Sequence, residues 1–165
     1  MAALESMISD AQIATLKLGF DNALCVKLAM ASLAGPIPAA QPWVAGPGDY
    51  FFATDKNMGP THRELCIIAM MTAMKCPDQL VIHVYWGLMV GLSPNQIADA
   101  IYLAGDYSGI AAYNTATKAA AIALGSLVAQ AEAGKADPPN LLAVTRVIPA
   151  LGQAYGRAMA GLPPA

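Results

Sequence analysis

Residues 63–88, RELCIIAMMTAMKCPDQLVIHVYWGL, set a few reactive side chains among long apolar runs. Apolar residues recur at helical spacing on both sides of Cys76 and Pro77, which predicts two helices joined by a short turn. Glu64 lies on the first of these helices and His83 on the second. If the helices form an antiparallel hairpin, Glu64 and His83 face each other across it.

The remainder of the chain also favours helices. Ala, Leu, Met and Ile dominate and β-branched runs are scarce, so we predict an all-α helical bundle. The clearest helix start is Ser93-Pro94-Asn95-Gln96, a capping box with proline at the first helical position. The predicted helices cover residues 9 or 10 to 32, 61–75, 77–91, 93–105 and 107–133, and a segment from 140 that is helical as far as Pro149.

The chain has 165 residues, the usual size of one domain, so residues 1–165 are predicted to share a single core. Residues 35–60 are dense in proline and glycine and form a long irregular connection. Residues 134–165 form a C-terminal extension to the central helices. Loops as long as 35–60 inside a compact domain are usually functional lids or wrapping arms.

Composition limits the classes of partner. Hydrophobic residues make up 56% of the chain and charged residues 12%, so an obligate homo-oligomer is expected to bury part of the apolar surface. The net charge is −2 and no basic cluster exists, which argues against nucleic acid and anionic membranes as partners. The longest uncharged runs, 28–48 and 79–98, are interrupted by proline, glycine or polar residues, so no membrane-spanning helix is predicted.

The cellular compartment is inferred from the charge order and the cysteines. Glu5 and Asp10 precede the first lysine, which is the wrong order for a signal peptide, so a cytoplasmic location is expected. Cys25, Cys66 and Cys76 are an odd number without a disulfide spacing, which favours reduced thiols. Cys25 and Cys66 lie in apolar surroundings and are expected to be small hydrophobic core residues.

Structural alternatives exist for both members of the predicted pair. A carboxylate beside an imidazole in an apolar site is an arrangement for general acid/base catalysis. Glu64, however, follows Thr61 by three residues, so it also fits a helix-capping T-x-x-E box, and His83 also fits a hydrogen-bonded core histidine. Metal binding is not predicted, because the only histidines are His62 and His83 and no pair of ligands has a recognised metal-site spacing.

The order of these residues resembles a known family. Arg63-Glu64-Leu65 is followed by Cys76, Gln79 and His83, then by GLSPNQIADAI and DYSGIAAYNTATKAA. Over about residues 60–125 this is similar to the carboxymuconolactone decarboxylase family, which includes the AhpD-like alkylhydroperoxidases. The resemblance implies an all-helical AhpD-like fold assembled as homotrimers or homohexamers. It also implies that Glu64 and His83 occupy the family's acidic and histidine positions.

The resemblance separates two branches of that family. In the AhpD-like peroxidases a C-x-x-C pair precedes the histidine, and Glu and His relay protons to the thiol. Here Cys76 matches the first cysteine, but Gln79 stands where the second, peroxide-reactive cysteine would be. Without that partner Cys76 cannot run a dithiol cycle, so peroxidase activity is disfavoured.

The other branch resembles decarboxylases that act on a small lactone acid without metal or organic cofactor. His83 is the expected proton donor, because histidine side chains normally titrate near neutral pH, and Glu64 is its orienting partner or base. Arg63 or His62 is predicted to meet the substrate carboxylate, with a solvated surface position as the alternative for Arg63. Gly109 is expected to permit close helix approach. The other predicted substrate-binding residues are Cys76, Gln79, Trp86, Tyr107 and Tyr113, with simple packing as the alternative for Tyr107 and Gly109.

Three functions follow from this sequence. The leading one is a cofactor-independent acid/base enzyme, a decarboxylase or a related lyase or isomerase, acting on a small enolisable acid or lactone. The second is a thiol-dependent redox protein that uses Cys76. The third is a non-catalytic binding or assembly protein that retains the fold.

Overall fold

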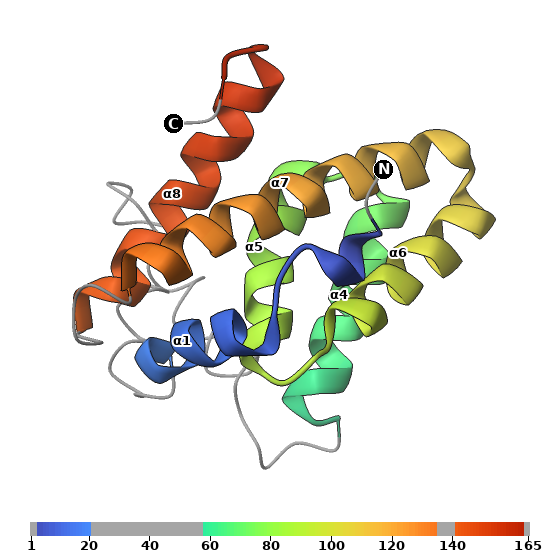
Figure 1. Cartoon of the computed structure of the whole chain (residues 1–165). Helices are drawn as coiled ribbons and strands as arrows, with labels where there is room; N and C mark the ends of the chain where they lie inside the picture. The colour runs from blue at the N-terminus through green and yellow to red at the C-terminus, as the bar shows by residue number, and fades with distance from the viewer. Residues whose placement is uncertain (1–2, 21–57, 135–140, 164–165) are drawn as a thin grey trace, which may run out of the picture.

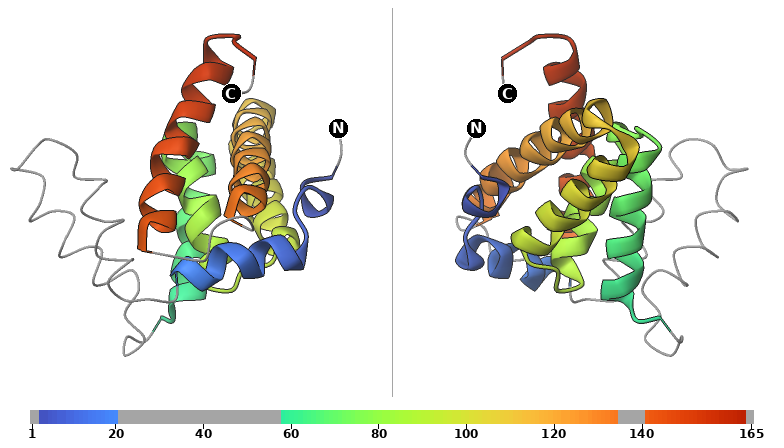
Figure 2. Two further views of the ribbon diagram at one scale, coloured as in Figure 1. Left: turned by 60° about the vertical axis from the view of Figure 1, so that its left-hand side comes forward. Right: turned by 90° about the vertical axis from the view of Figure 1, so that its right-hand side faces the viewer.

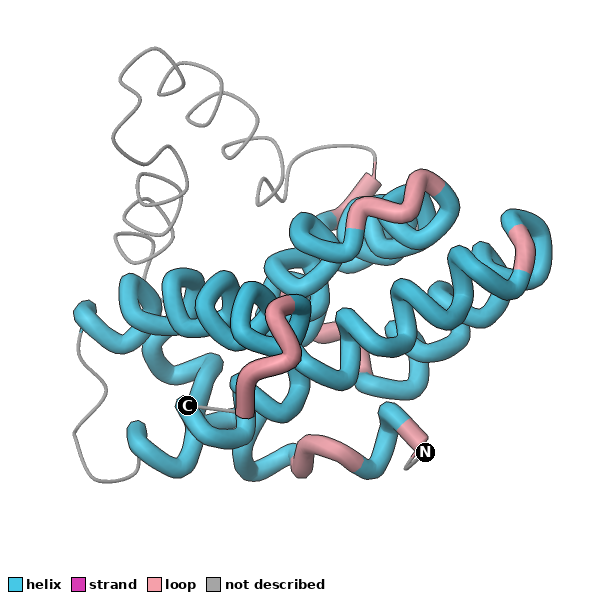
Figure 3. The backbone as a smooth tube through the Cα atoms, turned by 90° about the horizontal axis from the view of Figure 1, so that it is seen from above, coloured by secondary structure: helices cyan, strands magenta, loops and turns pink. Residues whose placement is uncertain are grey.

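The fold is all-α, as predicted, and a computed structural model describes it over residues 3–20, 58–134 and 141–163. In these ranges the chain forms helices and no strands (Figures 1 and 3). The elements are a short 3-10 turn, η1 (Leu4–Ser6), and the helices α1 (Asp10–Phe20), α4 (Pro60–Ala73), α5 (Pro77–Met89), α6 (Pro94–Ser108), α7 (Ile110–Gly134) and α8 (Leu141–Met159).

Helix α7 is the centre of the bundle. It packs against α1, α4, α5, α6 and α8, and Figure 2 shows α1 lying across one end of the bundle. The α7 residues in the core are mostly small, which lets neighbouring helices approach closely. The buried α7 residues are Thr117 and the apolar residues Ala112, Ala116, Ala119, Ala120, Ala123, Leu124, Leu127 and Ala131.

The predicted hairpin is formed by α4 and α5, which pack against each other. Its turn is a Schellman motif: the Cys76 amide donates to the Met71 carbonyl (3.0 Å) and the Lys75 amide donates to the Thr72 carbonyl (3.1 Å). Lys75 takes the left-handed conformation, with φ of 56°, that this motif requires just past the helix end. The motif places Cys76 directly before the first turn of α5.

The start of α6 is confirmed in detail. The Ser93 side chain accepts a hydrogen bond from the Gln96 amide, and the Gln96 side chain accepts one from the Ser93 amide. Gly91, with φ of 101°, ends the preceding helix α5. The glycine that ends α5 and the capping box that begins α6 together determine where the α5–α6 turn lies.

Two details of the α6–α7 hairpin differ from the prediction. Helix α6 continues three residues beyond the expected end at Gly105 and stops at Ser108. The predicted role of Gly109 in close packing is wrong, because a Cβ there would meet nothing within 4 Å; Gly109 instead turns the chain with φ of 94°. Gly105 allows the close approach, since its Cβ would lie 2.6 Å from the Cβ of Tyr113.

The C-terminal extension forms a helix, α8, that is continuous through Pro149, beyond which the sequence made no prediction. Helix α8 packs against α7, α5 and α1, with Val147 and Leu151 buried. Pro149 lies on the exposed face of α8. Packing of the opposite, buried face stabilises the helix although proline lacks a backbone N–H donor.

Some predictions fall outside the described residues. These are the part of the predicted first helix beyond residue 20, most of the 35–60 connection and Cys25. The single-domain assignment of residues 1–165 stays a prediction. Within the described ranges, no helix has both the length and the apolar character needed to cross a membrane.

Candidate active site

Glu64 and His83 meet inside the α4–α5 hairpin. His83 Nδ1 lies 2.9 Å from Glu64 Oε2. The Glu64 side chain is fully buried, and His83 is 8% exposed. With Glu64 ionised, Nδ1–H donates and the carboxylate accepts, which is a charge-assisted hydrogen bond between two buried side chains. The hairpin predicted from residues 63–88 therefore brings the carboxylate and the imidazole into direct contact.

The alternative that Glu64 is a helix cap is wrong. Helix α4 begins at Pro60 with Gly59 as its N-cap, and no side chain caps it. Thr61 instead donates its hydroxyl proton to the Val90 carbonyl at 2.9 Å. This bond ties the start of α4 to the end of α5, and so it holds the two helices in the register that pairs Glu64 with His83.

The second carboxylate oxygen of Glu64 is also buried. Among the described residues, Glu64 Oε1 has no hydrogen-bond partner. Buried polar atoms are normally satisfied, and the exceptions are often found where a water, a ligand or a proton belongs. The geometry thus gives Glu64 one oxygen engaged with His83 and one that can accept a further proton or donor.

Trp86 contacts the imidazole directly. The ring centroids of His83 and Trp86 are 5.1 Å apart and the ring planes meet at 89°, an edge-to-face arrangement. Trp86 is 3% exposed. Its neighbour Gly87 lies against α4, since a Cβ there would be 3.2 Å from Ile68 and 3.1 Å from Leu92.

The two predicted carboxylate binders occupy different environments. Arg63 is buried at 3% exposure, so the alternative of a solvated surface position is wrong. His62 is exposed on the outer face of α4. Arg63 therefore brings a positive charge into the interior of the protein beside Glu64 in the chain, whereas His62 faces solvent.

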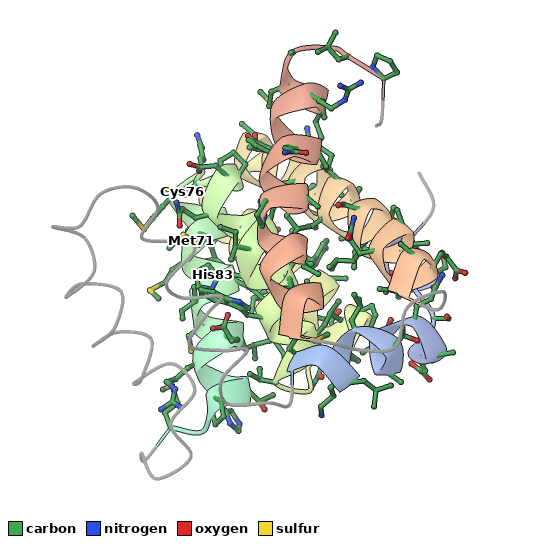
Figure 4. All side chains as sticks on the ribbon, turned by 90° about the vertical axis from the view of Figure 1, so that its left-hand side faces the viewer. Met71, Cys76 and His83 are labelled. Atoms are coloured by element: carbon green, nitrogen blue, oxygen red, sulfur yellow. The ribbon has the colours of Figure 1, made fainter. Side chains whose placement is uncertain are left out.

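The residues at the start of α5 lie closer to the surface. Cys76 is half-buried and Gln79 is exposed, and His83 follows Cys76 by two helical turns. Figure 4 shows the labelled Met71, Cys76 and His83 along the same side of the α4–α5 hairpin. The expectation that Cys66 is a core residue is wrong, because Cys66 is exposed on α4.

The two predicted tyrosines lie in the α6–α7 hairpin. Tyr107 is 86% exposed at the end of α6. Tyr113 is half-buried on α7, where its ring stands edge-on to that of Tyr102 at a centroid distance of 6.1 Å. Neither ring belongs to the buried pair, and the substrate-binding roles assigned to them stay predictions.

Sequence reasoning did not find all the residues that build this site. It treated Thr61 only as a cap and Trp86 only as a substrate contact, because hydrogen bonds and ring contacts between helices have no local signature. The spacing of His83 and Trp86, three residues apart on a helix, was the one available signal. Within the described ranges, no group of three or more His, Cys, Asp or Glu residues is arranged to hold a metal ion.

Comparison with known proteins identifies a family. The sequence profile of the Carboxymuconolactone decarboxylase family matches residues 38–121. That match covers half of the chain, including both helices of the α4–α5 hairpin, all of α6 and the first half of α7. No curated protein and no solved structure matches the chain.

Proposed function

Because the chain belongs to the carboxymuconolactone decarboxylase family, we propose that it is a cofactor-independent acid/base enzyme, a decarboxylase or a related lyase or isomerase. Its substrate class is a small enolisable carboxylic acid or lactone. The observation that carries this proposal is the 2.9 Å contact between His83 Nδ1 and Glu64 Oε2 in a buried site. Family membership supports the class of function, and this contact supports the chemistry.

Glu64 acts on His83 in two ways. Its carboxylate accepts the Nδ1 proton, which makes Nε2 the nitrogen that exchanges a proton with the substrate. It also balances the charge of the imidazolium, which would otherwise be costly to form at 8% exposure. The pair can therefore hold a proton inside the protein and transfer it without a metal ion.

In the decarboxylation, the bond between the substrate carbon and its carboxylate breaks. Its electron pair stays on the substrate as a dienolate, and carbon dioxide leaves. His83 then delivers a proton from Nε2 to the substrate carbon and is reprotonated from solvent. In the isomerase version the same pair removes a proton from one carbon and returns it to another.

The buried guanidinium of Arg63 is the proposed partner of the substrate carboxylate. A planar guanidinium matches a carboxylate with two parallel hydrogen bonds, and Arg63 precedes Glu64 directly in α4. Cys76 and Gln79 lie on the side of the hairpin where α5 begins and are the proposed polar contacts at the site entrance. Gln79 in place of a cysteine is why a dithiol peroxidase function is not proposed.

The proposed protein partner is a second copy of this chain. Four large hydrophobic side chains are exposed around the α6–α7 turn: Tyr102 (64%), Leu103 (61%), Tyr107 (86%) and Ile110 (71%). We call these four the α6–α7 surface. A chain with only 12% charged residues gains from covering such a surface, and pairing identical subunits is the common way to do so.

Turnover of the His83→Gln variant tests the proposed function. The wild type is assayed for carbon dioxide release from carboxymuconolactone and from a panel of small lactone acids and β-keto acids. His83→Gln is expected to lose about 10²–10⁴-fold in rate while its size in solution stays unchanged. Lys118→Gln, a change on the exposed face of α7, is the control. Full turnover by His83→Gln would rule the acid/base assignment out.

A further inference from the structure

The imidazole of His83 is held by contacts on two different sides. Glu64 Oε2 lies 2.9 Å from Nδ1, and Trp86 stands perpendicular to the imidazole ring at a centroid distance of 5.1 Å. We propose that Trp86 is a positioning residue that fixes the rotation of the His83 ring, rather than a wall of the substrate pocket. This inference rests on the proposed acid/base role of His83.

The hydrogen bond to Glu64 does not by itself fix the orientation of the His83 ring. The bond to Glu64 sets the position of Nδ1 and selects the tautomer, but the imidazole can still rock about the Nδ1···Oε2 direction. An edge-to-face contact resists that motion, because rocking removes the favourable alignment of one ring edge with the other ring face. Together the two contacts define the direction in which Nε2 points.

Trp86 can serve as a fixed support because it is itself immobilised. It is 3% exposed and lies one helical turn after His83 on the same helix. Gly87, the next residue, sits so close to Ile68 and Leu92 that even a methyl group there would crowd them. Helix α5 is therefore closely packed at this point, and the 3% exposure of Trp86 restricts the motion of its indole.

A second ring pair in the molecule shows what such a contact looks like outside a site. Tyr102 and Tyr113 also meet edge to face, at 6.1 Å and 88°. Tyr102 is 64% exposed, and Tyr113 is half-buried. The His83–Trp86 contact is shorter and buried, and one of its rings is bonded to a carboxylate, which is the arrangement expected where ring orientation matters.

Steady-state kinetics provide the first test. Trp86→Leu removes the aromatic ring and is expected to lower kcat about 10- to 100-fold with little change in KM, because small misplacements of a catalytic group are costly. Trp86→Phe keeps an aromatic edge and should recover most of the loss. Leu151→Ala, a buried truncation in α8, controls for destabilisation alone. A kcat within twofold of wild type for Trp86→Leu would overturn the proposal.

Fluorescence provides a test that needs no substrate. The chain's other tryptophan, Trp43, is replaced by phenylalanine, and excitation at the red edge of the tryptophan absorption band avoids the tyrosines, so that Trp86 is the tryptophan observed. The emission of Trp86 is measured as the pH is raised. A protonated imidazole in contact with an indole quenches the indole emission, so the emission is expected to rise in the pH range where His83 loses its proton. The transition should vanish in His83→Gln and should shift in Glu64→Gln, since Glu64 bonds to the same ring.

The two results distinguish failure of this inference from failure of the proposed function. An emission that does not depend on His83 would overturn the positioning role even if His83 is essential for turnover. If the His83-dependent transition is present but His83→Gln retains turnover, the acid/base function fails while the ring contact stands. A His83-dependent transition together with the Trp86→Leu loss in kcat supports the proposal.

Discussion

The two helical hairpins of this protein distribute polar and apolar groups in opposite ways. The α4–α5 hairpin buries charged or titratable side chains, with Arg63, Glu64 and His83 all at or below 8% exposure. The α6–α7 hairpin exposes large apolar ones, with Tyr107 at 86% and Ile110 at 71%. Each departs from the usual rule of apolar inside and charged outside.

Neither departure is explained by a gain in the stability of the single chain. Burying an ion pair is seldom stabilising compared with apolar residues of the same volume. Exposing a cluster of large apolar side chains favours association. We therefore propose that the first hairpin carries the chemistry and that the second carries the assembly, and each proposal is tested by reversing the local pattern.

Breaking the buried pair should have the largest effect on stability. His83→Leu leaves the fully buried Glu64 carboxylate without its partner, and we expect a loss of about 3–5 kcal/mol in unfolding free energy. The double variant Glu64→Met with His83→Leu should recover most of that loss but show no turnover. Thermal and urea unfolding measure both. If His83→Leu were as stable as the wild type, the view that His83 stabilises the buried Glu64 carboxylate would be contradicted.

Charging the second hairpin should disrupt assembly rather than folding. Leu103→Glu combined with Ile110→Glu places two negative charges in the α6–α7 surface, and we expect subunit affinity to fall by about 100-fold, the effect of losing a central contact in an interface. Light scattering over a range of concentrations measures this. Leu162→Glu, at another exposed leucine (53%), is the control and should not change the size. An unchanged size for the double variant would place the interface elsewhere.

A methyl group at Gly105 should loosen the second hairpin. The new Cβ would lie 2.6 Å from the Tyr113 Cβ and 3.0 Å from the Tyr113 Cα, so we expect Gly105→Ala to cost about 1–3 kcal/mol. For a chain of this size each kcal/mol lowers Tm by about 2–4 °C. Gly125→Ala in α7, where nothing lies within 4 Å, should instead stabilise slightly. Equal effects of the two substitutions would refute the close-packing explanation.

Removing the capping box should have the smallest effect. Ser93→Ala takes away the side chain that accepts the Gln96 amide proton, and we expect a loss of about 1 kcal/mol. Calorimetry measures the loss of stability. The variant Ser126→Ala, which removes a serine hydroxyl inside α7, is the control that separates the capping effect from the loss of a hydroxyl group. Turnover should be unchanged, because the capping hydrogen bonds join Ser93 and Gln96, two exposed residues; a large loss of activity would mean that the start of α6 shapes the site.

Local signals in the sequence predicted the fold well where the chain has them. The capping box at Ser93, the turn before Pro77 and the end of α7 near Gly134 all lie where side-chain chemistry determines the backbone. The failures have a common cause. The end of α6, the passage of α8 through Pro149 and the close approach at Gly105 depend on packing between helices, which single-helix patterns do not contain.

The candidate site shows the same division. The pairing of Glu64 with His83 could be predicted because a tight turn between two helices leaves few ways for them to pack. The burial of Arg63 and the exposure of Cys66 could not, since the periodicity of α4 does not say which apolar face turns inward. The ring contact of Trp86 on α5 could not either, since the helical spacing from His83 does not give the orientation of the two rings.

The central claim is that Glu64 and His83 act as one catalytic unit, and a double-mutant cycle on turnover tests it most directly. We measure kcat/KM for Glu64→Gln, His83→Gln and the double variant. If the two residues act together, the double variant should be no slower than His83→Gln alone, because the partner of a missing group has nothing left to contribute. Losses that multiply in the double variant would contradict the account.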